Sequence, residues 1–122
     1  FKGACLHESV LGGAFLQDAC FEGAILSGAN LVGAYAPGLL AAEARFDRYA
    51  RLANANFRKA HLAGAVFDSS ILRMADFTGA DLQGARFRGA NLEDCLFDGA
   101  NLAGVDWQGA NLNAARLQER QG

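Results

Sequence analysis

Residues 75–89 read ADFTGADLQGARFRG, and the same pattern of five residues continues to Asn113. Each unit holds a small residue, a polar residue, a large apolar residue, a second polar residue and often Gly. We call the large apolar residue the centre. A fixed internal period of this kind decides the architecture before any local preference does.

A period of five residues excludes an amphipathic helix. Positions five apart lie about 140° from each other around a helix axis, so the centres would scatter over every side. In an extended segment, residues two apart point to the same side. The small residue and the centre therefore both point inward, and a turn must reset the alternation once per unit. The recurrent Gly stands where that bend is needed.

This five-residue pattern resembles that of the pentapeptide-repeat family, whose consensus is Ala-Asp/Asn-Leu-X-X. The residues that match its central position are Phe77, Leu82, Phe87, Leu92, Phe97 and Leu102, and those that match its small position are Ala75, Ala80, Ala85, Ala90 and Ala100. The resemblance implies an all-β fold, a right-handed quadrilateral β-helix with one pentad per side and four per coil. The 122 residues would then form about six coils. Residues 20 apart would stack, with Phe57, Phe77 and Phe97 in one ladder and Phe67, Phe87 and Trp107 in another.

The chain is expected to form a single domain over residues 1–122. Its predicted parts are coils over 1–36, an interruption over about 37–53, coils over 54–117 and a polar C-terminal cap over 113–122. The pattern weakens in the interruption, where Ala36 and Ala41 would be centres that leave voids and Leu39 would clash at a small position.

Two interpretations of the interruption are open. Good helix formers and a three-and-four apolar spacing predict a short helix near 38–53 that lies against the rod. Alternatively, the coil continues with Tyr49 as one inserted residue, because the centres end in 1 or 6 before this point and in 2 or 7 after it.

Charge and composition limit the classes of function. With 11 basic and 13 acidic residues, the net charge of −2 indicates neither direct nucleic-acid binding nor a strongly acidic surface. No apolar run approaches the roughly 20 residues of a membrane span. Three cysteines without an apparent pairing fit a reducing compartment, and we expect a cytoplasmic location.

No set of residues predicts catalysis. Cys95 occupies an inward small position and is expected to be an inert core residue. His7 lies two residues from Cys5, but a zinc site wants about four converging ligands and no others are apparent. The glycines follow the period of five and match no nucleotide-binding motif. We therefore expect no enzyme activity, no metal site and no cofactor.

Two surfaces are candidates for binding a partner. The residue before each centre points outward, and in the N-terminal half this row is mostly apolar, with Val10, Phe15, Cys20, Ile25 and Tyr35. Exposed apolar patches usually mark interfaces. A basic docking patch is predicted around the interruption, from Arg45, Arg48, Arg51, Arg58 and Lys59.

The predicted function is a rigid non-catalytic scaffold that mediates protein–protein interaction, as part of a longer chain or as a dimer. Phe15 would be covered either by the helix after residue 37 or by a partner or second copy. One alternative, implied by the family resemblance, is a DNA mimic that binds DNA gyrase and protects it from inhibitors. Another is a targeting or spacer domain of a secreted effector.

Overall fold

Each pentad closes one tight turn, and residues 76–80 show how. In the computed structural model, which describes residues 1–6 and 8–117, the N–H of Ala80 donates to the carbonyl oxygen of Phe77 at 2.9 Å. Gly79, the third residue of this turn, has φ 70°. That is the left-handed region, which Gly adopts without the steric penalty of a Cβ atom. The repeated Gly is therefore explained by the geometry of the turn.

The same pentad is joined to the coils on both sides. Asp76 donates its N–H to the carbonyl of Ala55 at 3.0 Å in the preceding coil, and Phe77 donates to Leu96 at 2.7 Å in the following coil. Gly79 also donates to the following coil, to Asp98 at 2.9 Å. The backbone of one pentad is thus held by two neighbours.

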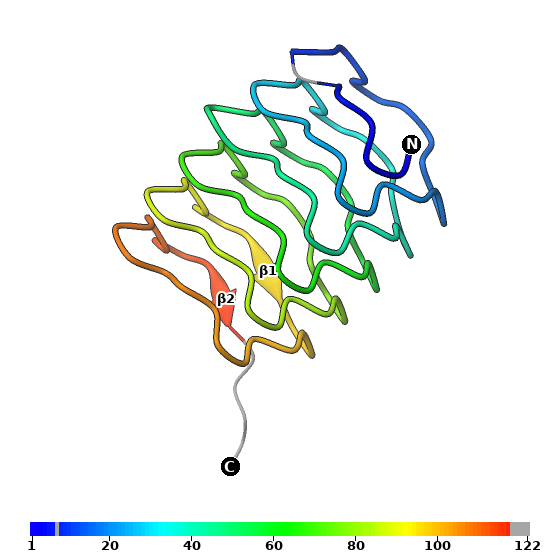
Figure 1. Cartoon of the computed structure of the whole chain (residues 1–122). Coiled ribbons are helices and arrows are strands. Elements are labelled where there is room, and N and C mark those ends of the chain that lie inside the picture. The colour runs from blue at the N-terminus through cyan, green and yellow to red at the C-terminus, as the bar shows by residue number, and fades with distance from the viewer. Residues whose placement is uncertain (7, 118–122) are drawn as a thin grey trace.

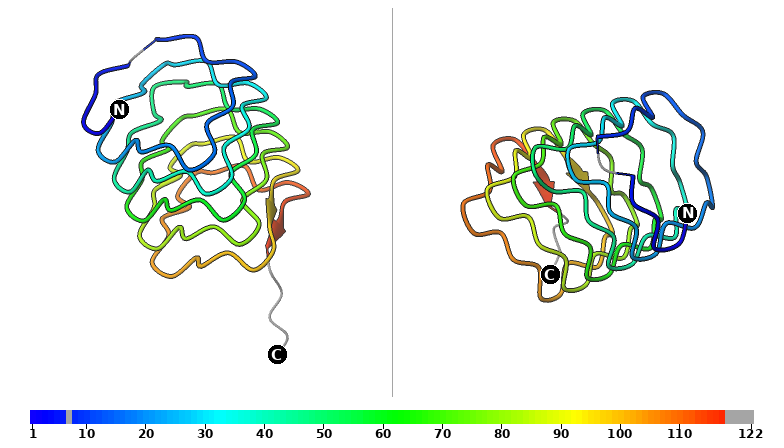
Figure 2. Two further views of the ribbon diagram at one scale, coloured as in Figure 1. Left: turned by 90° about the vertical axis from the view of Figure 1, so that its right-hand side faces the viewer. Right: turned by 45° about the horizontal axis from the view of Figure 1, so that its top comes forward.

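Repetition of these bonds builds a four-sided parallel β-helix (Figure 1). One outward residue per pentad pairs in parallel with the outward residue 20 positions later, as Asp81 does with Asn101. The pairing broadens into two strands near the C-terminal end, β1 (Leu96–Phe97) and β2 (Arg116–Leu117), which are parallel with Leu96 opposite Arg116. Figure 2 shows the coils stacked one behind another along the rod.

The pairing assigns every outward residue to one of four sides, numbered in chain order. Side 1 carries Cys5, Ile25, Arg45, Val66, Arg86 and Asp106. Side 2 carries Val10, Asn30, Arg51, Ile71, Asn91 and Asn111. Side 3 carries Phe15, Tyr35, Asn56, Asp76, Leu96 and Arg116. Side 4 carries Cys20, Leu40, His61, Asp81 and Asn101. Sides 1 and 3 are opposite, as are sides 2 and 4.

The centres fill the interior as ordered ladders. The rings of Phe57 and Phe77 are 5.3 Å apart and nearly parallel, and those of Phe77 and Phe97 are 5.2 Å apart. The second predicted ladder is also confirmed, with 4.8 Å between Phe67 and Phe87 and 5.3 Å between Phe87 and Trp107. Rings of neighbouring ladders meet edge to face, the arrangement that the aromatic quadrupole favours.

The predicted helix near 38–53 is wrong. Phe46 donates its N–H to the carbonyl of Val66 at 2.7 Å, and Arg45 pairs with Val66 as an ordinary outward residue. Pairs that span this segment are 21 residues apart, from Asn30 with Arg51 to Arg45 with Val66. The interruption is therefore one inserted residue. Pairing with two neighbouring coils overrides the local helix propensity, which is a weak preference.

The insertion places one extra residue between the centre Phe46 and the turn that follows it. Ala50 donates to the carbonyl of Asp47 at 3.2 Å, and both residues between them have positive φ, 54° at Arg48 and 66° at Tyr49. Two consecutive residues of this kind define a type I′ turn. Phe46 keeps its inward place, since its ring lies 5.0 Å from that of Phe67 in the next coil.

Leu39 does not clash, although it occupies a small position. It is fully buried, as are Ala36 and Ala41 at the two neighbouring centre positions. Leu39 lies between two positions where the large centre is replaced by Ala. We interpret this exchange as the reason why the expected clash does not arise.

Part of the expected C-terminal cap, residues 118–122, lies outside the described residues, as does His7. Over residues 1–6 and 8–117, no helix is long and apolar enough to cross a membrane.

Candidate interaction surfaces

Polar outward residues have a structural task in the turn that follows them. The Oδ1 atom of Asp76 accepts the N–H of Thr78 at 2.9 Å, so every N–H of this pentad is bonded. The same bond to the N–H two residues on is made by Asn30, Asn56, Asp81, Asn91, Asn101, Asp106 and Asn111. This Asx turn explains why the repeat prefers Asp or Asn before the centre.

Apolar outward residues cannot make that bond. Val10 and Phe15 are 78% and 80% exposed, and Phe15 has only an edge contact with Tyr35, at 5.9 Å between ring centroids. The prediction that residues 20 apart stack on one side holds for this row, since Phe15 pairs with Tyr35 and Cys5 with Ile25. The expected cover of Phe15 by a helix of the same chain is wrong, because that helix does not exist.

The apolar candidates surround the rod and do not form one face. Val10 lies on side 2, Phe15 and Tyr35 on side 3, Cys20 on side 4 and Ile25 on side 1. The analysis of the sequence missed Leu40, which pairs with Cys20 and is partly exposed. Its place in the row that runs every five residues from Cys5 could have revealed it, but the residue was assigned to a helix.

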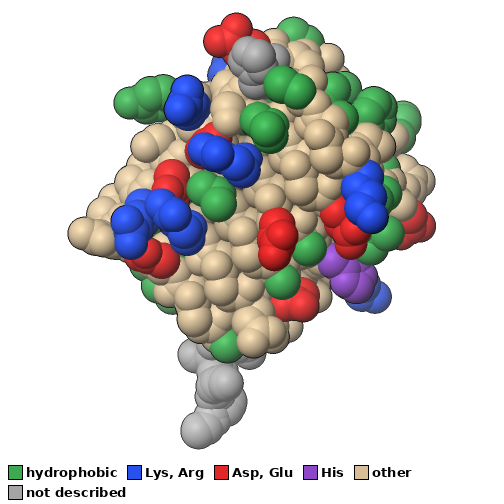
Figure 3. Space-filling view, viewed as in Figure 1, with side chains coloured by type: hydrophobic (Ala, Val, Ile, Leu, Met, Phe, Trp, Pro, Cys, Tyr) green, Lys and Arg blue, Asp and Glu red, His purple; other side chains and the backbone are tan. Residues whose placement is uncertain are grey.

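Sides 1, 3 and 4 each carry a pair of stacked residues from this row, and sides 3 and 4 adjoin each other and include both aromatic residues. We call Phe15, Tyr35, Cys20 and Leu40 the side 3–4 apolar surface. Hydrophobic side chains are frequent over the coils near the N-terminus, while acidic and basic side chains lie next to each other over later coils (Figure 3).

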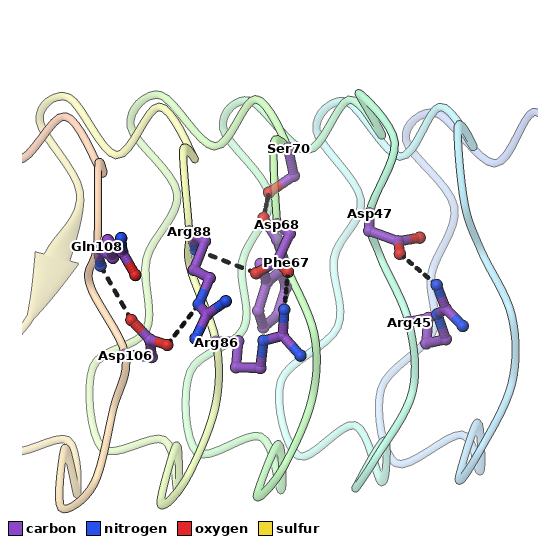
Figure 4. A network of polar contacts seen from close by, with 9 residues as sticks. All are labelled: Arg45, Asp47, Phe67, Asp68, Ser70, Arg86, Arg88, Asp106 and Gln108. Atoms are coloured by element: carbon purple, nitrogen blue, oxygen red, sulfur yellow. Dashed lines mark hydrogen bonds and ion pairs between the residues drawn. The ribbon is translucent and has the colours of Figure 1, made fainter.

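Ion pairs join neighbouring coils in a recurring geometry. The residue that follows a centre reaches the outward residue 18 positions on, as Arg88 does with Asp106 at 2.6 Å and Asp68 with Arg86 at 2.5 Å. Asp68 also accepts the backbone N–H of Arg88 at 3.0 Å (Figure 4). The hydrogen bond from Arg88 lowers the pKa of Asp106. These pairs are half exposed, so each contributes little to stability.

Asp47 is the most enclosed carboxylate of this kind. It is buried, accepts a hydrogen bond from the hydroxyl of Ser27, and pairs with Arg45 at 2.7 Å. Burial alone would raise its pKa, but the hydrogen bonds from Ser27 and Arg45 and the charge of Arg45 outweigh burial and lower it. The same contact raises the pKa of Arg45. The inserted turn is thereby tied to the coil before it.

The predicted basic residues divide between two opposite corners. Arg45 on side 1, Arg48 in the inserted turn and Arg51 on side 2 adjoin the corner between sides 1 and 2. Arg58 and Lys59 follow the centre Phe57 and lie at the corner between sides 3 and 4, where Arg58 pairs with Asp76 at 3.2 Å. Tyr49, 72% exposed beside Arg48, was missed as a surface residue, because it was expected either as the inserted residue or on the apolar face of the predicted helix.

The three cysteines have different surroundings. Cys95 is fully buried at a small position, as predicted, and its thiol donates to the carbonyl of Leu72 at 2.8 Å. Burial raises the pKa of Cys95 to about 12. Cys5 is exposed and Cys20 is intermediate. In the described part of the chain, no three His, Cys, Asp or Glu side chains form a group that could hold a metal ion.

Cys95 is expected to resist thiol reagents in the native protein. A pKa of about 12 against the ordinary 9.0 lowers the thiolate fraction about a thousandfold at pH 8, and burial denies access as well. Titration with a chromogenic disulfide should give the same native thiol count for wild type and Cys95→Ala, and one thiol fewer for Cys95→Ala in denaturant. A lower native count for the variant would contradict the buried assignment.

Comparison with known proteins agrees with this geometry. A family model described as pentapeptide repeat region matches residues 50–121, and one described as pentapeptide repeats (8 copies) matches residues 1–36. The first covers more than half of the chain, so the chain belongs to the pentapeptide-repeat family. The unmatched segment, residues 37–49, includes Leu39, Ala41 and most of the inserted turn. No match was found among curated proteins.

Solved structures share the fold. HetL, a pentapeptide repeat protein involved in heterocyst differentiation regulation from Nostoc sp. strain PCC 7120, aligns with a TM-score of 0.75 at 24% identity, over 99% of this chain and 65% of HetL. The chain therefore spans less than two thirds of HetL. Rfr23 from Cyanothece 51142 gives 0.54 at 22% identity, over 96% of this chain and 86% of that one. These structures imply a right-handed β-helix.

A third structure resembles the chain more weakly. It is a trypsin-treated form of QnrB1, a plasmid-mediated fluoroquinolone resistance protein, with 26% identity over 92% of this chain and 55% of that one. Its TM-score of 0.48 is too low to support an argument about this chain.

Proposed function

We propose that the chain is a rigid, non-catalytic scaffold that binds a protein partner through the side 3–4 apolar surface. The observation that carries the proposal is the exposure of Phe15 at a position where polar residues serve the fold. In the C-terminal half, Asp and Asn at this position complete the hydrogen bonding of the turn. The side chain of Phe15 cannot accept that hydrogen bond, and its ring is exposed to solvent next to Tyr35.

A rigid scaffold suits this kind of binding. Each side presents its outward side chains at the spacing of neighbouring strands, about 4.8 Å, on a backbone held by hydrogen bonds to both adjacent coils. Side chains on such a frame lose little conformational freedom on association, which favours affinity. Aromatic residues are also enriched among those that contribute most to interfaces.

Gyrase protection by DNA mimicry finds less support in this surface. A mimic needs regularly spaced negative charge without compensation, in place of phosphates. Here Asp47, Asp68, Asp76, Asp98 and Asp106 each pair with an arginine. No observation on the described residues favours that second function.

Phe15→Glu is expected to weaken partner binding about 10- to 30-fold, without loss of the fold. The ring has no neighbour in the core to lose, and a carboxylate would have to be desolvated at the interface. The matched control is Met74→Glu, which makes a similar change at an exposed apolar residue in the turn between sides 2 and 3.

The measurement uses all three proteins in parallel. Sedimentation velocity over a range of concentrations tests self-association, and each protein immobilised as bait tests binding of other chains. Loss of an associated species with Phe15→Glu, but not with Met74→Glu, supports the proposal. The proposal is contradicted if the wild type stays monomeric and, as immobilised bait, captures the same proteins as Phe15→Glu. Unchanged circular dichroism confirms that each variant is folded.

A further inference from the structure

Two arginines at the inserted corner differ from the others in the described part of the chain. Arg45, Arg58, Arg73, Arg86, Arg88 and Arg116 each form an ion pair with an acidic side chain. Within residues 1–6 and 8–117, neither Arg48 nor Arg51 has such a pair. Arginines without an ion pair therefore gather at the corner where the coil has its extra residue.

A groove of about 260 Å³ opens at the same corner. It is lined by Ile25, Ser27, Arg45 and Arg48. The inserted turn forms one wall of the groove through Arg48, which follows Asp47 in the chain. The turn is held against the preceding coil, because the N–H of Gly28 donates to the carbonyl oxygen of Asp47 at 2.9 Å. Ile25 contributes apolar surface, and it is 38% exposed.

Asp47 orients one of the arginines that line this groove. Its carboxylate holds the Nη2 atom of Arg45 at 2.7 Å and accepts the hydroxyl of Ser27. A guanidinium has five N–H donors in a fixed planar fork, so Arg45 keeps donors for a ligand after this contact. Arg48 adds a second guanidinium. The groove thus combines two cations and an apolar wall, and one of the cations is already oriented.

We infer that this corner is a docking site for an acidic peptide segment. A carboxylate of the peptide enters the groove between Arg45 and Arg48, and an apolar neighbour packs on Ile25. Tyr49, 72% exposed at the tip of the inserted turn, and Arg51 on side 2 extend the contact along the peptide. Arginine and tyrosine dominate the binding energy of many interfaces, and a guanidinium pairs well with a carboxylate.

The chemistry favours a peptide over a nucleic acid. A nucleic-acid footprint needs several phosphate contacts along a basic stripe. This corner has two arginines without an ion pair, and Arg45 shares its charge with Asp47. Glu8 lies on the same corner, with its Cγ atom 3.2 Å from the position that a Cβ atom on Gly28 would take. The surface therefore suits one or two carboxylates. This corner between sides 1 and 2 is separate from the side 3–4 apolar surface, so the inference does not depend on the function proposed above.

The test measures binding of a fluorescein-labelled peptide of alternating Glu and Leu by fluorescence anisotropy, with the Gln and Leu peptide as its neutral counterpart. At about 50 mM salt, where charges are weakly screened, the acidic peptide is expected to bind and the neutral one is not. Arg48→Gln combined with Arg51→Gln should weaken binding at least about tenfold.

The control removes the same charge at the opposite corner. Arg58→Gln combined with Lys59→Gln should leave the affinity within about twofold, because those residues lie at the corner between sides 3 and 4. Equal weakening by both double variants would show general charge attraction and overturn the proposal, as would absence of binding by the wild type. A DNA oligonucleotide that competes better than the peptide, and loses affinity with Arg48→Gln and Arg51→Gln, would assign the corner to nucleic acid instead.

Discussion

Phe77→Ala is expected to lower the free energy of unfolding by about 4–5 kcal/mol, near the top of the range for deleting a buried ring. Phe77 is fully buried and stacks on Phe57 at 5.3 Å and on Phe97 at 5.2 Å. It also meets the edges of Phe67 and Phe87. A cavity there loses contacts with four rings, and the hydrogen-bonded coils on either side limit collapse around it.

Urea melts followed by circular dichroism measure this loss. Phe77→Leu is the matched control, because it keeps an apolar side chain that the family accepts at this position, and its cost should be less than half as large. A loss below about 1 kcal/mol for Phe77→Ala would contradict the inward assignment. A changed slope with urea would instead indicate that unfolding is no longer two-state, which repeat proteins can show because each coil contacts only its neighbours.

Leu39→Ala is expected to cost about 3–5 kcal/mol, although Ala is the ordinary residue at a small position. Leu39 is fully buried between Ala36 and Ala41, which stand where other pentads have a large centre. Removing the one large side chain leaves alanine at five consecutive inward positions, from 34 to 44, and a cavity. A substitution that restores the family consensus should therefore destabilise this protein.

A double-mutant cycle tests the exchange of sizes directly. Ala36→Leu alone should overpack against Leu39 and cost about 1–3 kcal/mol. Combined with Leu39→Ala, it recreates a large centre followed by a small residue, and most of the loss should be recovered. Independent, additive effects of the two substitutions in thermal or urea unfolding would show that the two positions do not share one space.

The sequence predicted the fold because the repeat is local and the turn is stereotyped. Inward alanines, inward centres and a Gly with positive φ follow from alternation and sterics within five residues. The stacked partners Phe57, Phe77 and Phe97 then follow from four pentads per coil, a number that came from the family resemblance. Sequence reasoning also placed Cys95 in the core and paired Phe15 with Tyr35.

The errors arose where local preference and coil pairing disagree. Residues 39–52 contain good helix formers, yet seven of their backbone N–H groups donate to carbonyl oxygens of neighbouring coils, as Phe46 does to Val66. Sequence reasoning also predicted a clash at Leu39, because it compared each position with the consensus separately and expected a large residue at every centre. Packing depends on the combined volume of adjacent positions, and Ala36 and Ala41 are small where other pentads have a large centre beside the small position.

By itself, the sequence determined a solenoid with inward centres and a row of outward residues, since these depend on the period and on the chemistry of single pentads. The four sides and the stacked ladders came from the family resemblance. Only the tertiary structure decided which outward residues share a surface around the inserted residue and beyond it. Arg45, Arg48 and Arg51 meet at one corner and Arg58 and Lys59 at the opposite one, although 15 residues contain them all. The reason is that each pentad turns the chain to a new side, so closeness in sequence places residues on different sides and neighbours on one side come from different coils.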